Sequence, residues 1–251
     1  MRIRTAALSG LCGLLAFARP ADVSPSTFED RPAITLSNGR LSASILTQGS
    51  TIAQIVLSGS PSGSDDKLGP LWNPMRMARE LGRTANFNPG IGHFVCVDGF
   101  GGTSQEERAA GFPGHGEAHR QMFELQYPDE GNSTATLKMT ALLPLVQELF
   151  VRTYRLVDGE NVLYVESQLE NLVSFDRPIS WAEHATAGSP WLESGVTVFD
   201  VSGTRAQTRK FPQPDPPNSP VQRRFPGGLD FTWPMAPGLN GAVVDLSLIH
   251  I

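Results

Sequence analysis

The sequence predicts an all-β fold in which antiparallel strands pack as two facing sheets. Apolar and polar residues alternate with period two in several segments, which is typical of strands that bury one face. Two of these segments flank the pair Asn38-Gly39, and two others flank residues 157–161, so both pairs are predicted hairpins. No long helical pattern separates the strands, and sheet-on-sheet packing is the simplest way to bury so many half-apolar segments.

Composition excludes some classes of protein. The chain has 251 residues, of which 40% are hydrophobic, and this is ample for a packed core. Its 25 Gly and 20 Pro indicate many turns. The net charge of -5 provides no basic surface for phosphate contacts, so a nucleic-acid partner is not expected. A neutral or weakly acidic ligand fits this composition better.

The N-terminus is predicted to direct export. Residues 1–18 combine a charged start, an apolar run and a small-x-small end, Ala16-Phe17-Ala18, as in a secretory signal peptide. The run is too short to anchor the chain in a bilayer, and Leu11 before Cys12 argues against a lipid anchor. We therefore expect a periplasmic or secreted protein with no membrane attachment after cleavage. The alternative is an unprocessed N-terminal strand or tail.

The elements expected after residue 18 are mostly strands. Residues 19–32 are assigned to an N-terminal extension and residues 33–251 to one β domain. Predicted strands cover residues 33–36, 41–46, 51–57, 121–127, 134–143, 148–156, 162–170, 229–234 and 241–247. A loop is expected at 58–69, a short helical turn at 75–81 and a stiff surface excursion at 213–220. The Gly- and Pro-rich stretch 84–116 is expected to be irregular and functional, since loops on a β scaffold often carry binding residues.

Cys96 is the one cysteine left after signal cleavage, so no intramolecular disulfide is possible. A thiol nucleophile would need a histidine partner. The surrounding Phe94-Val-Cys-Val97 is instead typical of a buried strand, and a structural role is the favoured interpretation.

His115 and His119 are the first candidates for chemistry. Gly114 and Gly116 flank His115, and small neighbours let a ligand approach a side chain and the backbone amides beside it. The alternative is a turn that only opens the next strand. The spacing also suggests a metal site completed by His93 or Glu117, but Gly116 argues against a helix. In an extended segment the two side chains would lie about 13 Å apart, so no metal and no cofactor are predicted.

His184 is the second candidate. Trp181 and Trp191 lie on either side of it in the sequence, and indole rings can stack on the apolar faces of sugars. The alternative is a buried histidine beside structural tryptophans. No Gly-x-Ser-x-Gly elbow, phosphate-binding loop or dinucleotide fingerprint is present in the sequence.

Three segments in order resemble the galactose mutarotase-like superfamily, which includes the aldose 1-epimerases. The first is the hairpin at residues 36–52, with its Asn-Gly turn. The second is Pro113-Gly-His115-Gly-Glu-Ala-His119-Arg120, which is similar to the family's His-Gly segment. The third is Leu169-Glu-Asn171-Leu followed by Pro178 and Trp181-Ala-Glu-His184, which is similar to the stretch that leads to the family's second histidine.

The resemblance implies a fold and a mechanism. The fold is an antiparallel β-supersandwich with an open cleft for a monosaccharide or the end of a sugar chain. In the mechanism, a carboxylate takes the proton from the anomeric hydroxyl while a histidine protonates the ring oxygen, and the ring opens, rotates and recloses. His184 would be the general acid, and His115 would hold and polarise the oxygen at the anomeric end. His119, Arg120, Trp181 and Asp230 would contact the sugar.

One departure from the family keeps other functions open. The family's catalytic glutamate lies late in the chain, whereas the last Glu here is Glu193. The strand pattern of residues 241–247 continues almost to the end of the sequence, so we expect the domain to be incomplete at its C-terminus. His250 lies in the last four residues and is not a candidate site residue. The rival function is a non-catalytic sugar-binding or accessory β domain of a polysaccharide-processing protein. A third is a metalloprotein that uses His93, His115 and His119.

Overall fold

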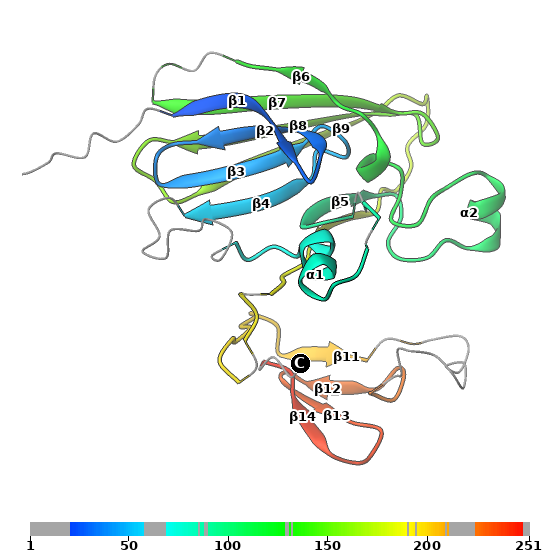
Figure 1. Ribbon diagram of the computed structural model, residues 1–251. Helices are drawn as coiled ribbons and strands as arrows, with labels where there is room; N and C mark the ends of the chain where they lie inside the picture. The colour runs from blue at the N-terminus through cyan, green and yellow to red at the C-terminus, as the bar shows by residue number, and fades with distance from the viewer. Residues whose placement is uncertain are drawn as a thin grey trace, which may run out of the picture.

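The computed structural model describes residues 21–57, 69–84, 86–87, 90–128, 131, 133–189, 191–193, 195–208, 210 and 224–247. The predicted signal peptide, the predicted excursion at 213–220, most of the loop at 58–69 and His250 lie outside the described residues. The described chain forms two antiparallel sheets that face each other, with short helices and two small ribbons outside them (Figure 1). The predicted all-β antiparallel sandwich is therefore confirmed.

Six strands form the larger sheet. In spatial order they are β1 (Asp22–Phe28), β2 (Arg31–Ser37), β3 (Leu41–Leu46), β4 (Ile52–Leu57), β5 (His93–Val97) and β10 (Trp181–Ala185). The facing sheet consists of β6 (Glu124–Gln126), β7 (Thr134–Leu143), β8 (Glu148–Val157) and β9 (Leu163–Asn171). The chain thus returns from β9 to the larger sheet, where β10 pairs with β5.

Alternate residues of the two sheets meet in the core. Leu36, Ile45 and Val95 of the larger sheet and Leu137, Phe150 and Leu156 of the smaller sheet have no exposed surface. Alternation in β8 is complete from Glu148 to Leu156, where every second side chain is buried. Phe150, Tyr154 and Leu156 follow the apolar positions of the sequence pattern, whereas Glu148 and Arg152 are buried charges that pair with Arg177 and Glu183. The period-two pattern predicts the strands at 134–143, 148–156 and 162–170 to within a residue or two.

Asn38 explains the first hairpin and ties it to the other sheet. Its Oδ1 accepts hydrogen bonds from the backbone amides of Arg40 and Leu41, and Gly39 adopts a φ of 77°, which closes the turn. Its Nδ2 donates to the carbonyl oxygens of Val157 (2.6 Å) and Glu160 (2.8 Å) in the turn between β8 and β9. The two predicted hairpins are therefore joined by one buried amide.

The larger sheet begins earlier than the sequence pattern predicts. β1 pairs along its whole length with β2, although it lies in the segment 19–32 that was expected to be an extension. The boundary expected at residue 33 thus falls inside a hairpin. β1 contains Pro25 and little apolar alternation, both of which an edge strand tolerates because one of its sides needs no partner.

The stretch 84–116 is more regular than expected. It contains β5, which is nearly fully buried, and the helix α2 (Gln105–Ala109), which begins with a capping box between Ser104 and Glu107. α1 (Pro74–Glu80) corresponds to the predicted helical turn, and a 3-10 turn, η2, covers Ala118–Arg120. The buried strand predicted around Cys96 is therefore confirmed as β5, whereas α2, whose five residues are too few to show a helical period, was not predicted.

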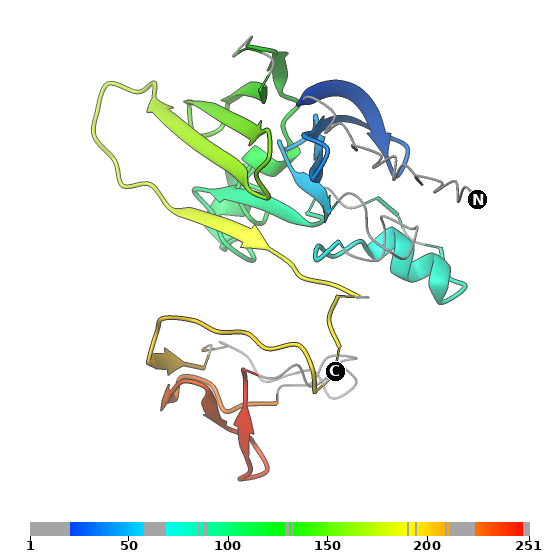
Figure 2. The same cartoon turned by 90° about the vertical axis from the view of Figure 1, so that its left-hand side faces the viewer.

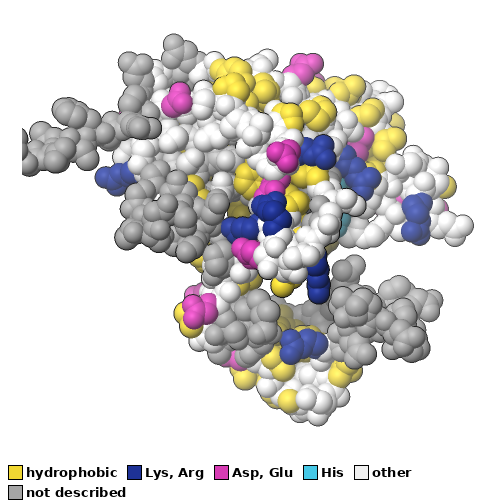
Figure 3. Space-filling view, viewed as in Figure 1, with side chains coloured by type: hydrophobic (Ala, Val, Ile, Leu, Met, Phe, Trp, Pro, Cys, Tyr) yellow, Lys and Arg dark blue, Asp and Glu magenta, His cyan; other side chains and the backbone are white. Residues whose placement is uncertain are grey.

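The C-terminal residues form two small ribbons. β11 (Arg205–Gln207) pairs with β12 (Asp230–Thr232), and β13 (Met235–Pro237) pairs with β14 (Val243–Asp245). Both views show these ribbons beside the sandwich rather than within it (Figures 1 and 2). Among the described residues no helix combines the length and apolar character that a membrane span requires. On the face shown in Figure 3, basic and acidic side chains are interspersed among apolar ones.

Candidate functional site

The pairing of β10 with β5 places His184 opposite Phe94. Successive side chains of a strand point to opposite faces, so His184 lies on one face of β10 and its neighbour Glu183 on the other. The rings of His184 and Phe94 are stacked, with centroids 4.5 Å apart and an interplanar angle of 16°. Phe94 therefore marks the face of the sheet on which the site is built.

His115 reaches the same face from a strained loop. Its φ is 67°, and Gly116 follows with a φ of 75°, so two consecutive residues are left-handed. Gly116 forms a parallel bridge with Val97 of β5, and a Cβ there would overlap the carbonyl oxygen of Val97. A left-handed residue other than glycine costs about 1–2 kcal/mol, and such strain is common at functional sites. The loop is thus pressed against β5 and carries His115 over it.

Three histidines and two phenylalanines form one cluster. The ring centroids of His115 and His184 are 5.3 Å apart, and those of His115 and His119 are 6.3 Å apart. Phe94 contacts all three imidazoles, and the exposed Phe100 contacts His115 and His184, each at 5.7 Å. Segments far apart in the sequence therefore bring both predicted catalytic histidines together.

Phe94 and the three histidines of the cluster line an open hollow of about 370 Å³. Its walls are Trp72, Gly90, Phe94, Gly114, His115, His119, Arg120, His184 and Thr186. The hollow thus includes four of the residues predicted from the sequence: His115, His119, Arg120 and His184. Small-molecule sites usually have volumes of roughly 300–1,000 Å³.

Two predicted contact residues lie elsewhere. Trp181 is on the opposite face of β10, where its ring packs against Phe150 with centroids 5.5 Å apart. Asp230 lies in β12, in a C-terminal ribbon, and accepts a hydrogen bond from the side chain of Gln207 at 2.8 Å. Neither residue lines the hollow.

Trp72 is the aromatic residue that sequence reasoning missed. Its backbone amide donates to the carbonyl of Thr186 at 2.8 Å, and its carbonyl accepts from the amide of Gly92 at 3.1 Å. These bonds hold it between the two segments that border the hollow. Trp72 lies in a loop just before the predicted helical turn at 75–81. An indole in a loop can stack on a sugar, and this was the feature by which the sequence could have indicated Trp72 as a site residue.

Three imidazoles and the guanidinium of Arg120 are among the side chains that line the hollow. Burial, followed by the charge of Arg120 and the neighbouring His115, lowers the pKa of His119 to about 4. Burial and the neighbouring His184 and Arg120 also lower the pKa of His115. Both imidazoles are therefore neutral near pH 7, and Arg120 supplies a permanent positive charge.

No carboxylate is among the described residues that line the hollow. Glu117 lies between His115 and His119 in the sequence, but its side chain is buried. It accepts hydrogen bonds from the backbone amides of Leu145 (2.8 Å) and Val146 (3.0 Å). Glu183, beside His184, faces the other way and bonds to Arg152 and His93. Both carboxylates thus have structural partners away from the hollow.

The residues of the metal hypothesis are divided between two faces. His93 precedes Phe94 in β5 and lies 2.8 Å from Glu183, on the face opposite His115. The expected separation of about 13 Å between His115 and His119 is wrong, because the segment turns into η2 instead of remaining extended. In the described part of the chain, no group of three or more His, Cys, Asp or Glu side chains has the geometry to hold a metal ion.

Cys96 has the histidine partner that a nucleophile would need, yet its protonation state is unsuitable. Its Sγ lies 3.6 Å from Nδ1 of His115. Burial raises the pKa of Cys96 to about 11, so the sulfur is a thiol at neutral pH. It is also fully buried. The predicted structural role agrees with these properties.

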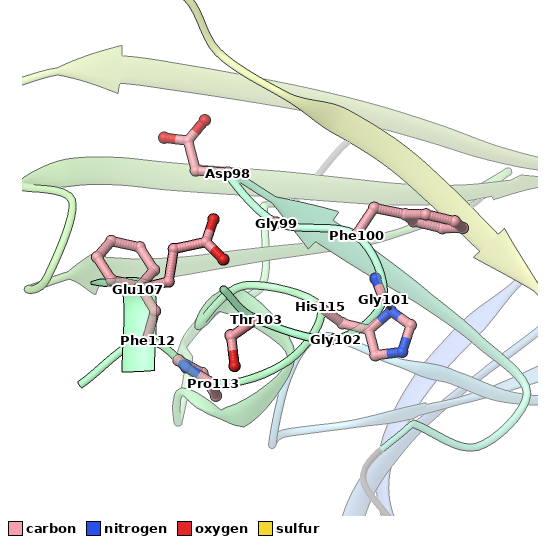
Figure 4. Close-up of a pocket in the computed structure, with 10 residues that line it drawn as sticks. All are labelled: Asp98, Gly99, Phe100, Gly101, Gly102, Thr103, Glu107, Phe112, Pro113 and His115. Atoms are coloured by element: carbon pink, nitrogen blue, oxygen red, sulfur yellow. Dashed lines mark hydrogen bonds between the residues drawn. The ribbon is translucent and has the colours of Figure 1, made fainter. Parts of the chain in front are cut away.

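A second, smaller pocket of about 40 Å³ lies behind His115 (Figure 4). The loop from Asp98 to Thr103 forms one wall, and Glu107, Phe112, Pro113 and His115 form the other. A space of this size holds water rather than a sugar. The carboxylate of Glu107 already accepts a hydrogen bond from the backbone amide of Ser104 in the capping box of α2.

Comparisons with known proteins give distant structural matches. No family model matches the chain, and no curated protein sequence matches it. The Salmonella typhimurium protein YeaD, a proposed mutarotase, shares 16% identity with a TM-score of 0.38 over 54% of this chain and 43% of its own. The solved structure of HI1317 shares 18% identity with a TM-score of 0.38 over 62% of this chain and 48% of its own. The chain matches less than half the length of each of these proteins.

Proposed function

We propose that this protein binds a sugar in the hollow beneath His115 and His184 and interconverts its anomers by acid–base catalysis, as aldose 1-epimerases do. The observation that carries the proposal is the 5.3 Å separation of the two imidazole centroids, although the residues lie far apart in the sequence. Both line a hollow of suitable size, together with Trp72 and Phe94. Aromatic faces of this kind suit the apolar faces of a pyranose.

The contacts of each histidine support different roles. Nδ1 of His184 lies 3.2 Å from the hydroxyl of Thr186, which can donate or accept, so either protonation state of His184 is accommodated. His184 is therefore suited to deliver a proton to the ring oxygen and to recover it. His115 stays neutral and would hold the anomeric oxygen. Arg120 and His119 would contact other hydroxyls.

The base that takes the anomeric proton is assigned to a carboxylate outside the described lining residues. If such a carboxylate is absent from the protein, the same hollow would bind sugar without converting it. The lack of a carboxylate among the described lining residues thus favours, as a second candidate, a sugar-binding or accessory β domain. In either case, export to the periplasm or the medium would give access to free sugars or sugar ends.

The proposal is tested by polarimetry on freshly dissolved α-anomers of D-galactose and D-glucose. We expect the purified protein to accelerate the approach to anomeric equilibrium and His184→Asn to reduce that acceleration about 100- to 10,000-fold, the usual contribution of a general acid. His93→Asn is the matched control, since His93 lies on the paired strand but on the opposite face, and its activity should match the wild type.

Three results would count against catalysis. Unchanged activity of His184→Asn would remove the acid role, and equal losses in His184→Asn and His93→Asn would indicate general damage to the sheet. Saturable binding of either sugar by the wild type, seen by NMR without acceleration, would favour the binding domain.

A further inference from the structure

The hydrogen bonds around His115 determine which ring nitrogen carries its proton. The backbone amide of Gly101 donates to Nδ1 of His115 at 3.3 Å. An amide N–H can only donate, so Nδ1 must be the unprotonated nitrogen. Neutral His115 then carries its single hydrogen on Nε2. Figure 4 shows the imidazole lying beside Gly101.

Cys96 provides a second donor at the same nitrogen. Its Sγ is 3.6 Å from Nδ1, and burial, with a smaller effect from Glu183, raises the pKa of Cys96 to about 11. The sulfur therefore keeps its hydrogen at neutral pH and can act as a weak donor. Both hydrogens are directed at Nδ1, and a proton on that atom would have to displace them.

The backbone keeps this arrangement in place. The amide of His115 donates to the carbonyl of Gly101 at 3.0 Å, so the two residues are bonded in both directions. His115 is left-handed, and Gly116, which has no Cβ, lets the loop come close enough to bridge with Val97 of β5. The titratable groups next to His115 on the neighbouring elements are Cys96, His119, Arg120 and His184, and the carboxylates of Asp98 and Glu107 line the small pocket behind it. None of the first four favours a second proton on the ring, and the two carboxylates already bond to Arg177 and to the backbone amide of Ser104.

His119 is held neutral in the opposite tautomer. Nε of Arg120, which can only donate, lies 3.4 Å from Nε2 of His119. His119 therefore carries its hydrogen on Nδ1. His184 differs from both, since its Nδ1 meets a hydroxyl that adapts to either state.

We propose that His115 is a fixed hydrogen-bond donor, with its proton held on Nε2 by the amide of Gly101 and the thiol of Cys96, and that Cys96 is a positioning residue. The catalytic meaning of this assignment rests on the proposed function. In that setting His115 offers an N–H to the anomeric oxygen throughout the reaction, and the proton that moves is the one on His184.

The first test is NMR of ¹⁵N-histidine-labelled protein between pH 5.5 and 9, with long-range ¹H–¹⁵N spectra that distinguish the two ring nitrogens. We expect the His115 signals to report the Nε2–H tautomer over the whole range. A His115 signal of the Nδ1–H tautomer, or of a doubly protonated ring at pH 6.5, would overturn the proposal. This measurement needs no sugar and no activity, so it stands even if the proposed function fails.

The second test compares Cys96→Ala with Cys96→Ser, both checked for folding by circular dichroism. Alanine removes the donor, and serine restores one in a similar position. We expect the alanine variant to lose about 3- to 10-fold in kcat for the D-galactose anomers with a smaller change in KM, and its His115 pKa to rise, because one net hydrogen bond is lost. The serine variant should recover most of both effects. Equal behaviour of the two variants in kcat and in the His115 spectra would show that Cys96 only fills space.

Discussion

The core between the two sheets and the loop that carries His115 are held by different kinds of interaction. In the core, the strands bury alternate side chains, as β8 does from Glu148 to Leu156, and the two buried charges of that strand, Glu148 and Arg152, are held by ion pairs. In the loop, the conformation depends on left-handed residues, on Gly116 against Val97 and on the paired bonds between Gly101 and His115. The core therefore stabilises the fold through the apolar surface area that it buries, whereas the loop fixes the position of His115 through a few specific contacts.

A core substitution should have the largest effect on stability. Phe150 is fully buried and contacts Phe123 and Trp181. We expect Phe150→Ala to lower the free energy of unfolding by about 3–5 kcal/mol, because it removes apolar contacts and leaves a cavity. Urea unfolding followed by fluorescence measures this.

Phe100→Ala is the matched control in the loop. Phe100 is 60% exposed, although its ring contacts His115 and His184. Its loss should change the free energy of unfolding by less than about 1 kcal/mol while shifting the NMR signals of both histidines. A destabilisation as large as that of Phe150→Ala would contradict the distinction between core and loop.

Two glycines in turns test whether contact with β5 holds the loop that carries His115. Gly116 and Gly159 have φ angles of 75° and 79°, but only a Cβ at Gly116 meets a neighbour, the carbonyl of Val97. Gly159→Ala should cost about 1 kcal/mol from the left-handed conformation alone, and Gly116→Ala about 2–3 kcal/mol. The stabilities come from urea unfolding and the position of His115 from NMR. Equal costs at the two positions would show that contact with β5 does not hold the loop.

The site also gives a pH dependence of stability. The pKa of His119 is lowered to about 4, whereas an unfolded histidine titrates near 6.5, so the unfolded chain binds more protons between these values. Stability is therefore complete above about pH 7 and falls as the pH falls toward 4, by up to about 2 kcal/mol at pH 5. His119→Gln should lose this part of the slope in unfolding curves between pH 5 and 8. A slope equal to that of the wild type would mean that His119 titrates normally in the folded state.

The same contrast explains what the sequence could predict. Strands such as β7 and β8 could be predicted from the period-two alternation of the sequence alone, because successive side chains of a strand point to opposite faces of the sheet. β1 was missed because an edge strand needs no such pattern, whereas β5 was predicted from the short apolar run around Cys96. His115 and His184 were chosen from their local sequence and from resemblance. Their approach to each other depends on the pairing of β10 with β5, which no local pattern encodes.

The contact residues show the same limit. Trp181 was preferred because it lies near His184 in the sequence, yet strand alternation turns it to the other face. Trp72 lines the hollow only because bonds to Thr186 and Gly92 bring a distant segment to the site. Cys96 could be predicted as buried, but its contact with His115 arises from the left-handed loop.

The amide of Ser180, just before β10, bonds to Asp98, just after β5, although the two residues are 82 positions apart. All of the four-stranded sheet lies between them in the chain. Closing so long a loop is entropically costly. The hollow therefore exists only in molecules in which this long-range pairing of β10 with β5 is formed. Any sugar that binds there would stabilise only the folded protein, so the amount of bound sugar would measure the fraction of molecules that are folded.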